Sequence, residues 1–155
     1  MVDKLIIVDI LPIEYKKDYD LIFEALSTID LNSISNRFDI DNHLKKYFKD
    51  ELFISFLSKN LVRSKDGSFR FKCNLSSLIN NIDNILGQIN SNFFYEGKAF
   101  FIKGLNSDYI SDEGLKRTQV LFPNHNLIPV EDGGHWLHHE KQKEFFDICK
   151  ELLTT

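Results

Sequence analysis

Cysteine is scarce in this sequence, and long apolar runs are missing. The two cysteines, Cys73 and Cys149, are widely spaced, which fits neither a disulfide framework nor a zinc ribbon. They indicate reduced thiols, and hence a cytoplasmic location is expected. No apolar run reaches the ~18 residues that a membrane span needs, so no membrane-spanning helix is expected. The short apolar run Leu5–Val8 is flanked by acids and precedes no small-residue cleavage site, which argues against a signal peptide.

Positive charge is not in excess either. The formal net charge is -4 and the sequence pI is about 5.7, which disfavours nucleic acid as a partner, because phosphate binding normally needs a basic face. What the chain does have is ordinary globular composition in 155 residues, enough for one domain with a real core. Its 14 phenylalanines predict a core or a binding face rich in aromatic surface.

Three short apolar runs have the character of strands buried in a parallel sheet. They are Lys4–Ile10, Lys98–Lys103 and Leu127–Val130. Pro129 lacks a backbone donor, so the last of these is expected at a sheet edge. We expect the three strands to be parallel neighbours.

Helical spacing of apolar residues dominates the rest of the chain. Between Pro12 and about Asn92 it predicts a mostly helical layer over the carboxyl ends of the strands, with a turn at Asp66-Gly67. After the second strand, Ser111–Leu121 is a plausible helix although Gly114 weakens it. The helices expected are Asp20–Ile29, Asp41–Phe48, Glu51–Leu61, Ser76–Ile85, Ser111–Leu121 and His139–Leu153. Strands that alternate with helices predict the α/β class, with part of a doubly wound parallel sheet.

Polar groups follow each expected strand. Asp9 ends the first, Asn106-Ser107-Asp108 follows the second, and Gly133-Gly134-His135-Trp136 follows the third. Ligands of open parallel sheets bind outside the carboxyl ends of the strands, so these groups are placed at the functional edge. An acid followed along the chain by a histidine matches the tail of the order Ser, Asp/Glu, His in α/β-hydrolases.

Several segments resemble small abhydrolase-type esterases of the α/β-hydrolase superfamily, both bacterial and mitochondrial. Leu5–Tyr15 (LIIVDILPIEY) resembles the strand and loop after the nucleophile region, and Gly67–Phe71 (GSFRF) resembles part of the helical cap. Phe101–Ile110 (FIKGLNSDYI) and Gly133–Lys141 (GGHWLHHEK) resemble the loop after the cap and the histidine loop. The likeness runs over nearly the whole chain, and it implies the last strands of that fold with a helical cap inserted at about residues 12–95.

The resemblance implies a catalytic acid and base. It gives Asp9 as the triad acid and His135 as the histidine, with Asp108, at a position that many other α/β-hydrolases use, as the alternative acid. Histidine suits the role of base because an unperturbed imidazole titrates near neutral pH, and the acid fixes its tautomer. The plainer alternatives are that Asp9 caps a turn and that His135 is a structural histidine.

The nucleophile of such a triad has no counterpart here. No Gly-x-Ser-x-Gly occurs in the sequence, and no His-Gly oxyanion loop follows an early strand. The resemblance therefore covers the second half of the fold. It implies a carboxylic ester or thioester hydrolase acting on a small acyl ester, and the chain alone is expected to be inactive. The alternative is an inactive homologue that serves as a binding or interaction module.

The expected partners follow from the same reasoning. A separate N-terminal half, or self-association, would cover the flank of the first strand. No cofactor is expected. A metal site at His135, His138, His139 and Glu140 is not expected, because adjacent histidines on a helix point in different directions.

Overall fold

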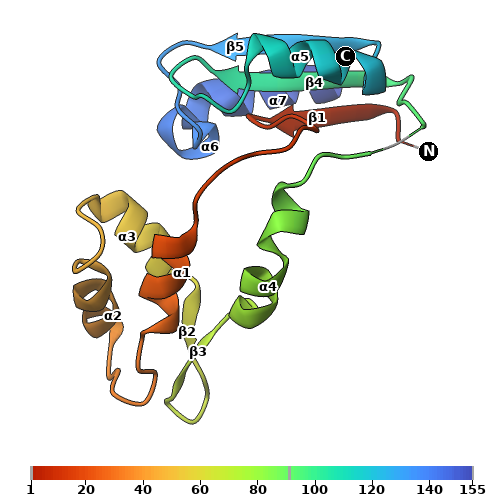
Figure 1. Ribbon diagram of the computed structural model, residues 1–155. Coiled ribbons are helices and arrows are strands. Elements are labelled where there is room, and N and C mark those ends of the chain that lie inside the picture. The colour runs from red at the N-terminus through yellow and green to blue at the C-terminus, as the bar shows by residue number, and fades with distance from the viewer. Residues whose placement is uncertain (1, 91, 155) are drawn as a thin grey trace. The chain divides into compact units, whose positions relative to one another are not determined.

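The computed structural model describes residues 2–90 and 92–154 and divides the chain into two compact units. The first unit joins the residues up to Tyr15 to those from Gly87 onward, and the second is Lys16–Leu86 (Figure 1). The inserted segment expected at residues 12–95 therefore has a compact counterpart, while its role as a cap stays a prediction.

A three-stranded parallel sheet forms the centre of the first unit. Its strands are β1 (Lys4–Val8), β4 (Lys98–Gly104) and β5 (His125–Val130), in the order β1-β4-β5. The register pairs Val8 with Ile102 and Gly104 with Val130. The predicted parallel neighbours and the edge position of the Pro129 strand are confirmed. In the described part of the chain, no strand pairs with the other side of β1.

Helices cover both faces of this sheet. Helix α5 (Asp112–Leu121) lies on one face, and α7 (Gln142–Thr154) lies on the other, after the short α6 (Leu137–Glu140) (Figure 1). Alternate strand residues supply the two cores, as period-two geometry requires. One core contains Leu11, Ala99, Phe101 and Ile110, with Leu5, Ile7 and Leu115 against it. The other contains Ile102, Val130 and Leu137, with Ile6, Val8, Phe145 and Ile148 against it. The predicted α/β class is confirmed.

Gly114 sits inside α5 for a packing reason. A Cβ at this position would meet the side chains of Leu11 and Ile13. The helix begins at a good cap, since the Ser111 hydroxyl accepts a hydrogen bond from the Gly114 amide at 3.1 Å. The glycine that weakens this helix in the sequence therefore lets the segment after β1 pack closely on it.

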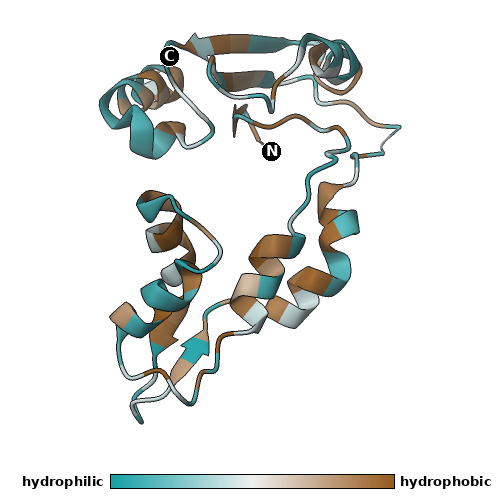
Figure 2. Cartoon of the chain, turned by 60° about the vertical axis from the view of Figure 1, so that its left-hand side comes forward, coloured by the Kyte–Doolittle hydropathy of each residue, from teal (hydrophilic) through white to brown (hydrophobic). Residues whose placement is uncertain are grey.

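The second unit is mostly helical. It contains α1 (Asp20–Ser27), α2 (Arg37–Leu44), α3 (Glu51–Ser58), α4 (Leu75–Leu86) and a hairpin of β2 (Leu61–Arg63) and β3 (Phe69–Phe71). Its helices carry apolar and polar bands side by side (Figure 2). One core cluster holds the unit together, formed by Ala25, Leu26, Ile29, Ile40, Leu44, Ile54, Leu57 and Leu61.

Three sequence-based expectations in this unit were wrong. The helix expected at Glu51–Leu61 ends at Ser58, and Leu61 begins β2. The β2–β3 hairpin was not predicted, because three-residue strands are too short to show alternation, although the turn at Gly67 (φ +91°) was recognised. The helix expected at Asp41–Phe48 begins earlier, at Arg37. Its start is fixed by a capping box in which Asn36 and Asp39 exchange hydrogen bonds, a signal that the apolar spacing does not carry.

In the part of the chain that the structure describes, no helix combines the length and the apolar character required to cross a membrane. Both cysteines are free thiols.

Candidate active site

Asp9 lies at the end of β1 and has an unusual backbone conformation. Its φ is +49°, in the left-handed region, which aspartate tolerates better than most residues. Its amide donates to the carbonyl of Ile102 at 2.8 Å, so the residue is tied to the neighbouring strand β4. The side chain is fully buried. Unusual backbone geometry of this kind concentrates at functional positions.

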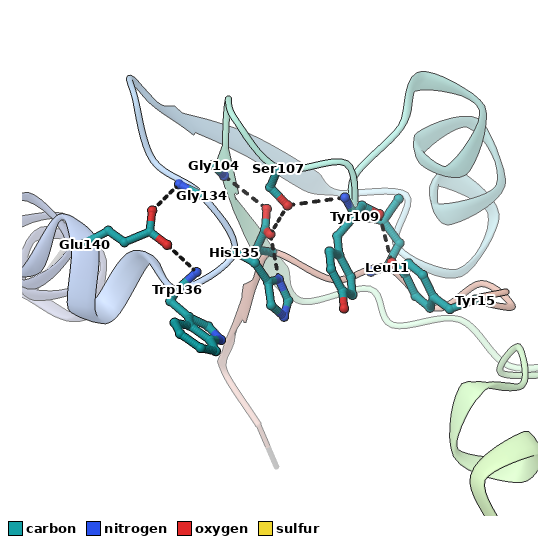
Figure 3. Close-up of polar contacts among 10 residues, drawn as sticks. Leu11, Tyr15, Gly104, Ser107, Tyr109, Gly134, His135, Trp136 and Glu140 are labelled. Atoms are coloured by element: carbon teal, nitrogen blue, oxygen red, sulfur yellow. Dashed lines mark hydrogen bonds and ion pairs between the residues drawn. The ribbon is translucent and has the colours of Figure 1, made fainter. Parts of the chain in front are cut away.

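Three donors converge on the Asp9 carboxylate. The Gly104 amide donates to Oδ1 at 3.1 Å, while the Ser107 hydroxyl and His135 Nδ1 both donate to Oδ2, the latter at 2.8 Å (Figure 3). The donors come from the end of β4, the loop after it and the loop after β5. A buried carboxylate that accepts three hydrogen bonds is held in one orientation.

His135 is the exposed member of this pair. Its side chain is 40 % exposed. Because a carboxylate only accepts, Nδ1 carries the hydrogen in this pair and Nε2 is the acceptor of the neutral ring. Among residues 2–90 and 92–154, nothing hydrogen-bonds to Nε2. The arrangement can therefore take a proton from a group that approaches Nε2.

Close backbone contacts bring the histidine loop to the end of β4. The Asn106 amide donates to the Gly133 carbonyl at 2.8 Å, and the Leu105 amide donates to the Val130 carbonyl at 3.1 Å. A Cβ on Gly104 would collide with the carbonyl oxygens of Gly133 and Gly134. Glycine at this position is required for the approach that places His135 beside Asp9.

Glu140 holds the same loop from its other side. Its carboxylate accepts from the amides of Gly134 at 2.6 Å and of Trp136 at 3.3 Å, the two residues that flank His135 (Figure 3). From the sequence, Glu140 was considered only as a metal ligand, and this role was not predicted. In the described residues, no group of three His, Cys, Asp or Glu side chains is placed to hold a metal ion.

Two further side chains of the loop after β4 contact the pair. Ser107 donates to Asp9, and its oxygen accepts from the Tyr109 amide at 3.3 Å. Its hydroxyl hydrogen is thus committed to the acid and not to His135. Tyr109 stacks on the imidazole, with ring centroids 3.8 Å apart and an interplanar angle of 11°.

Tyr15 supports Tyr109 from the segment after β1. Its hydroxyl accepts from the Leu11 amide at 2.7 Å and donates to the Tyr109 carbonyl at 3.0 Å. Burial raises the pKa of the Tyr15 hydroxyl above its ordinary value, and the nearby carboxylates of Asp9 and Asp108 add to this effect. The hydroxyl therefore stays protonated, as its donor role requires.

Asp108, the alternative acid, is exposed in the same loop. His135 Nδ1 carries one hydrogen and donates it to Asp9, so this nitrogen has no second hydrogen to donate to Asp108. The contact expected between Asp9 and His135 is thus present, whereas the catalytic roles of Asp9, Asp108 and His135 stay predictions.

Ser107 was predicted to lie at the functional edge, but no role there was assigned to it, and Tyr109 and Glu140 were not predicted as supports of the acid–base pair. A usable signal for the first two was their place directly after a strand, beside Asp108. Glu140 carried no such signal, because its partners are backbone amides.

Two of three comparisons with known proteins find esterases, while no family model matches the chain. It is 33% identical over 157 residues to a putative esterase/lipase of Haemophilus influenzae, a match that covers 99% of this chain and 52% of that protein. It is 28% identical to the sn-1-specific diacylglycerol lipase ABHD11 of Danio rerio, over 94% of this chain and 47% of that protein.

A solved structure of a marine microorganism esterase has the same fold. It superimposes with a TM-score of 0.92 at 34% identity, covering 97% of this chain and 60% of that one. The chain spans about half the length of the curated relatives it matches. The chain therefore corresponds to part of the fold of these proteins.

Proposed function

Because the chain belongs to the α/β-hydrolase superfamily, with abhydrolase-type esterases as its relatives, we propose that it provides the acid and the base of a serine ester hydrolase. The proposed substrate is a carboxylic ester or thioester with a small or medium acyl group. The proposed base is His135, and the proposed acid is Asp9.

The contact between His135 Nδ1 and Asp9 Oδ2 carries this proposal. A buried carboxylate at Nδ1 fixes the tautomer in which Nε2 accepts a proton, and it stabilises the imidazolium that then forms. A serine hydroxyl is a weak nucleophile until such a base takes its proton. The His135 side chain is 40 % exposed, and among the described residues no hydrogen bond engages its Nε2, which supports this role.

The nucleophile is proposed to come from residues outside this sequence, in the same polypeptide or in a separate one. No Gly-x-Ser-x-Gly occurs in these 155 residues. Ser107 is a poor substitute, because its hydroxyl donates to Asp9. The backbone amides of an oxyanion hole, worth about 10²–10³ in rate for each donor, would have to come from the same source.

The test joins this chain to the first half of a related esterase that contains Gly-x-Ser-x-Gly, either fused or co-expressed. We expect a serine that reacts with a fluorophosphonate probe and turnover of p-nitrophenyl esters, with both lost in the His135→Ala variant. The matched control is His125→Ala, which changes a histidine that lies on β5.

The 155-residue chain alone should hydrolyse none of these esters. Turnover by the isolated chain that disappears in His135→Ala would overturn the proposed source of the nucleophile. An assembled protein that binds acyl esters without cleaving them would favour the inactive binding module. A cytoplasmic location and a cap role for Lys16–Leu86 are part of the same proposal.

A further inference from the structure

One face of the His135 ring is covered by an aromatic side chain that the acid–base pair itself does not require. The rings of Tyr109 and His135 are nearly parallel and in van der Waals contact, with centroids 3.8 Å apart (Figure 3). Asp9 contacts only the Nδ1 edge of the same imidazole. The ring is thus held at one edge by a hydrogen bond and at one face by a stack.

The edge contact alone leaves the ring loosely oriented. The torsion that turns an imidazole about its Cβ–Cγ bond is broad, so a side chain that is 40 % exposed can rock away from its acceptor. A flat ring packed on one face removes that freedom, and it also attracts the imidazolium that forms on proton uptake.

Tyr109 is itself fixed on both sides of its backbone. Its amide donates to Ser107 Oγ at 3.3 Å, and its carbonyl accepts from Tyr15 Oη at 3.0 Å. The Tyr15 hydroxyl also accepts from the Leu11 amide, and the two tyrosine rings lie 5.4 Å apart. Leu11 is only two residues beyond Asp9, so the edge contact and the face contact are both anchored in the segment that follows β1.

We propose that Tyr109 is a positioning residue that holds the His135 imidazole against Asp9 by stacking on one ring face, with Tyr15 fixing Tyr109 in place. In this proposal the flat aromatic face of Tyr109 is the part that orients the imidazole. The catalytic consequence rests on the proposed role of His135 as the base, while the positioning itself does not.

The experiment on the isolated chain reads the Nδ1 hydrogen directly. Proton NMR of the purified 155-residue protein should show a downfield Nδ1–H resonance that exchanges slowly with water and disappears in His135→Asn. Tyr109→Phe keeps the aromatic face and should keep the resonance. Tyr109→Leu keeps bulk without the flat face and should broaden the resonance or abolish it.

A second variant keeps the proposal testable if the Tyr109→Leu protein does not fold. Tyr15→Phe leaves the stacked rings untouched and removes the hydroxyl that fixes the Tyr109 carbonyl, so the resonance should remain but exchange faster than in the wild type. The proposal is overturned if the wild-type chain shows no such resonance, if Tyr109→Leu retains it at full strength, or if Tyr109→Phe loses it.

In the assembled esterase, Tyr109→Leu should lower kcat by up to about 10²-fold with KM unchanged, the cost of a slightly misplaced catalytic group. Tyr109→Phe should restore kcat. If the resonances behave as expected and the assembled protein has no esterase activity, the proposed function fails and the positioning stands. Equal kcat values in the Phe and Leu variants would remove the catalytic part of the inference.

Discussion

His135 Nδ1 lies 2.8 Å from Asp9 Oδ2, although 126 positions separate the two residues in the sequence. They meet at one end of the parallel sheet, where Asp9 follows β1 and His135 follows β5, with β4 between these strands. The contact depends on the register of three strands and on the glycines that let the last loop approach. It is a property of the assembled unit and not of any local motif.

Asp9→Asn tests the assignment of the acid. In the assembled esterase this change should lower kcat by about 10⁴-fold, because an amide at Nδ1 favours the wrong imidazole tautomer. Asp108→Asn is the matched control and should be mild. Steady-state kinetics on both variants decide the question. A crippled Asp108→Asn with a mild Asp9→Asn would reverse the assignment.

Glu140→Ala should loosen the histidine loop. The amides of Gly134 and Trp136 lose their acceptor, so their hydrogen exchange should accelerate, and Glu140→Gln should show a smaller effect because its amide oxygen still accepts. Glu131→Ala, at an exposed position of the same loop, serves as the control. Unchanged exchange at both amides in Glu140→Ala would show that the loop is held by other contacts.

Gly104→Ala should destabilise the first unit by overpacking. The new Cβ meets the carbonyl oxygens of Gly133 and Gly134, and misfits of this kind cost about 1–3 kcal/mol, or roughly 3–10 °C in unfolding midpoint for a chain of this size. Val120→Ala, where the side chain is 73% exposed, should change the midpoint little. Thermal unfolding followed by circular dichroism measures both, and equal midpoints would contradict the expected collision.

Tyr15 should weaken the fold at alkaline pH. Its pKa is raised in the folded chain, chiefly by burial, so the unfolded state ionises first as the pH rises. The contribution of Tyr15 to stability is complete below a pH of about 10 and is lost as the pH rises through the higher folded-state pKa. The difference between wild type and Tyr15→Phe in absorbance at 295 nm isolates this group, and its midpoint should lie above that of a free tyrosine.

In the described residues one side of β1 has no partner strand, and this should make the isolated chain associate with itself. Unpaired backbone groups along a strand invite pairing with a second chain. Sedimentation or light scattering at micromolar concentrations should show dimers or larger species, which disappear when the nucleophile-bearing half is supplied. A stable monomer at these concentrations would contradict the expectation.

The sheet was predictable from sequence because its signals are strong and local. Runs such as KLIIVDI and KAFFIK are apolar over most of their length, which favours strands of a parallel sheet, and Pro129 placed the third strand at an edge. The boundaries of α2 and the β2–β3 hairpin were not predictable in this way, because they depend on a capping box and on pairings of three residues each.

In the candidate site, too, some residues were predictable from the sequence and others were not. Asp9 and His135 were recognisable because they follow strands and match a family pattern. The supporting contacts were not, since Glu140 binds backbone amides and Tyr109 contributes a ring face. Neither kind of interaction leaves a residue pattern in the sequence.

The left-handed backbone at Asp9 narrows the set of residues that this position can accept. Glycine and asparagine would suit the φ of +49° but bring no negative charge, while glutamate would bring the charge on a longer chain with less tolerance for that backbone. The backbone conformation and the negative charge are therefore two separate requirements, and aspartate is the residue that meets both. A comparison of Asp9→Asn, Asp9→Gly and Asp9→Glu would measure how much of its importance belongs to folding and how much to its proposed catalytic role.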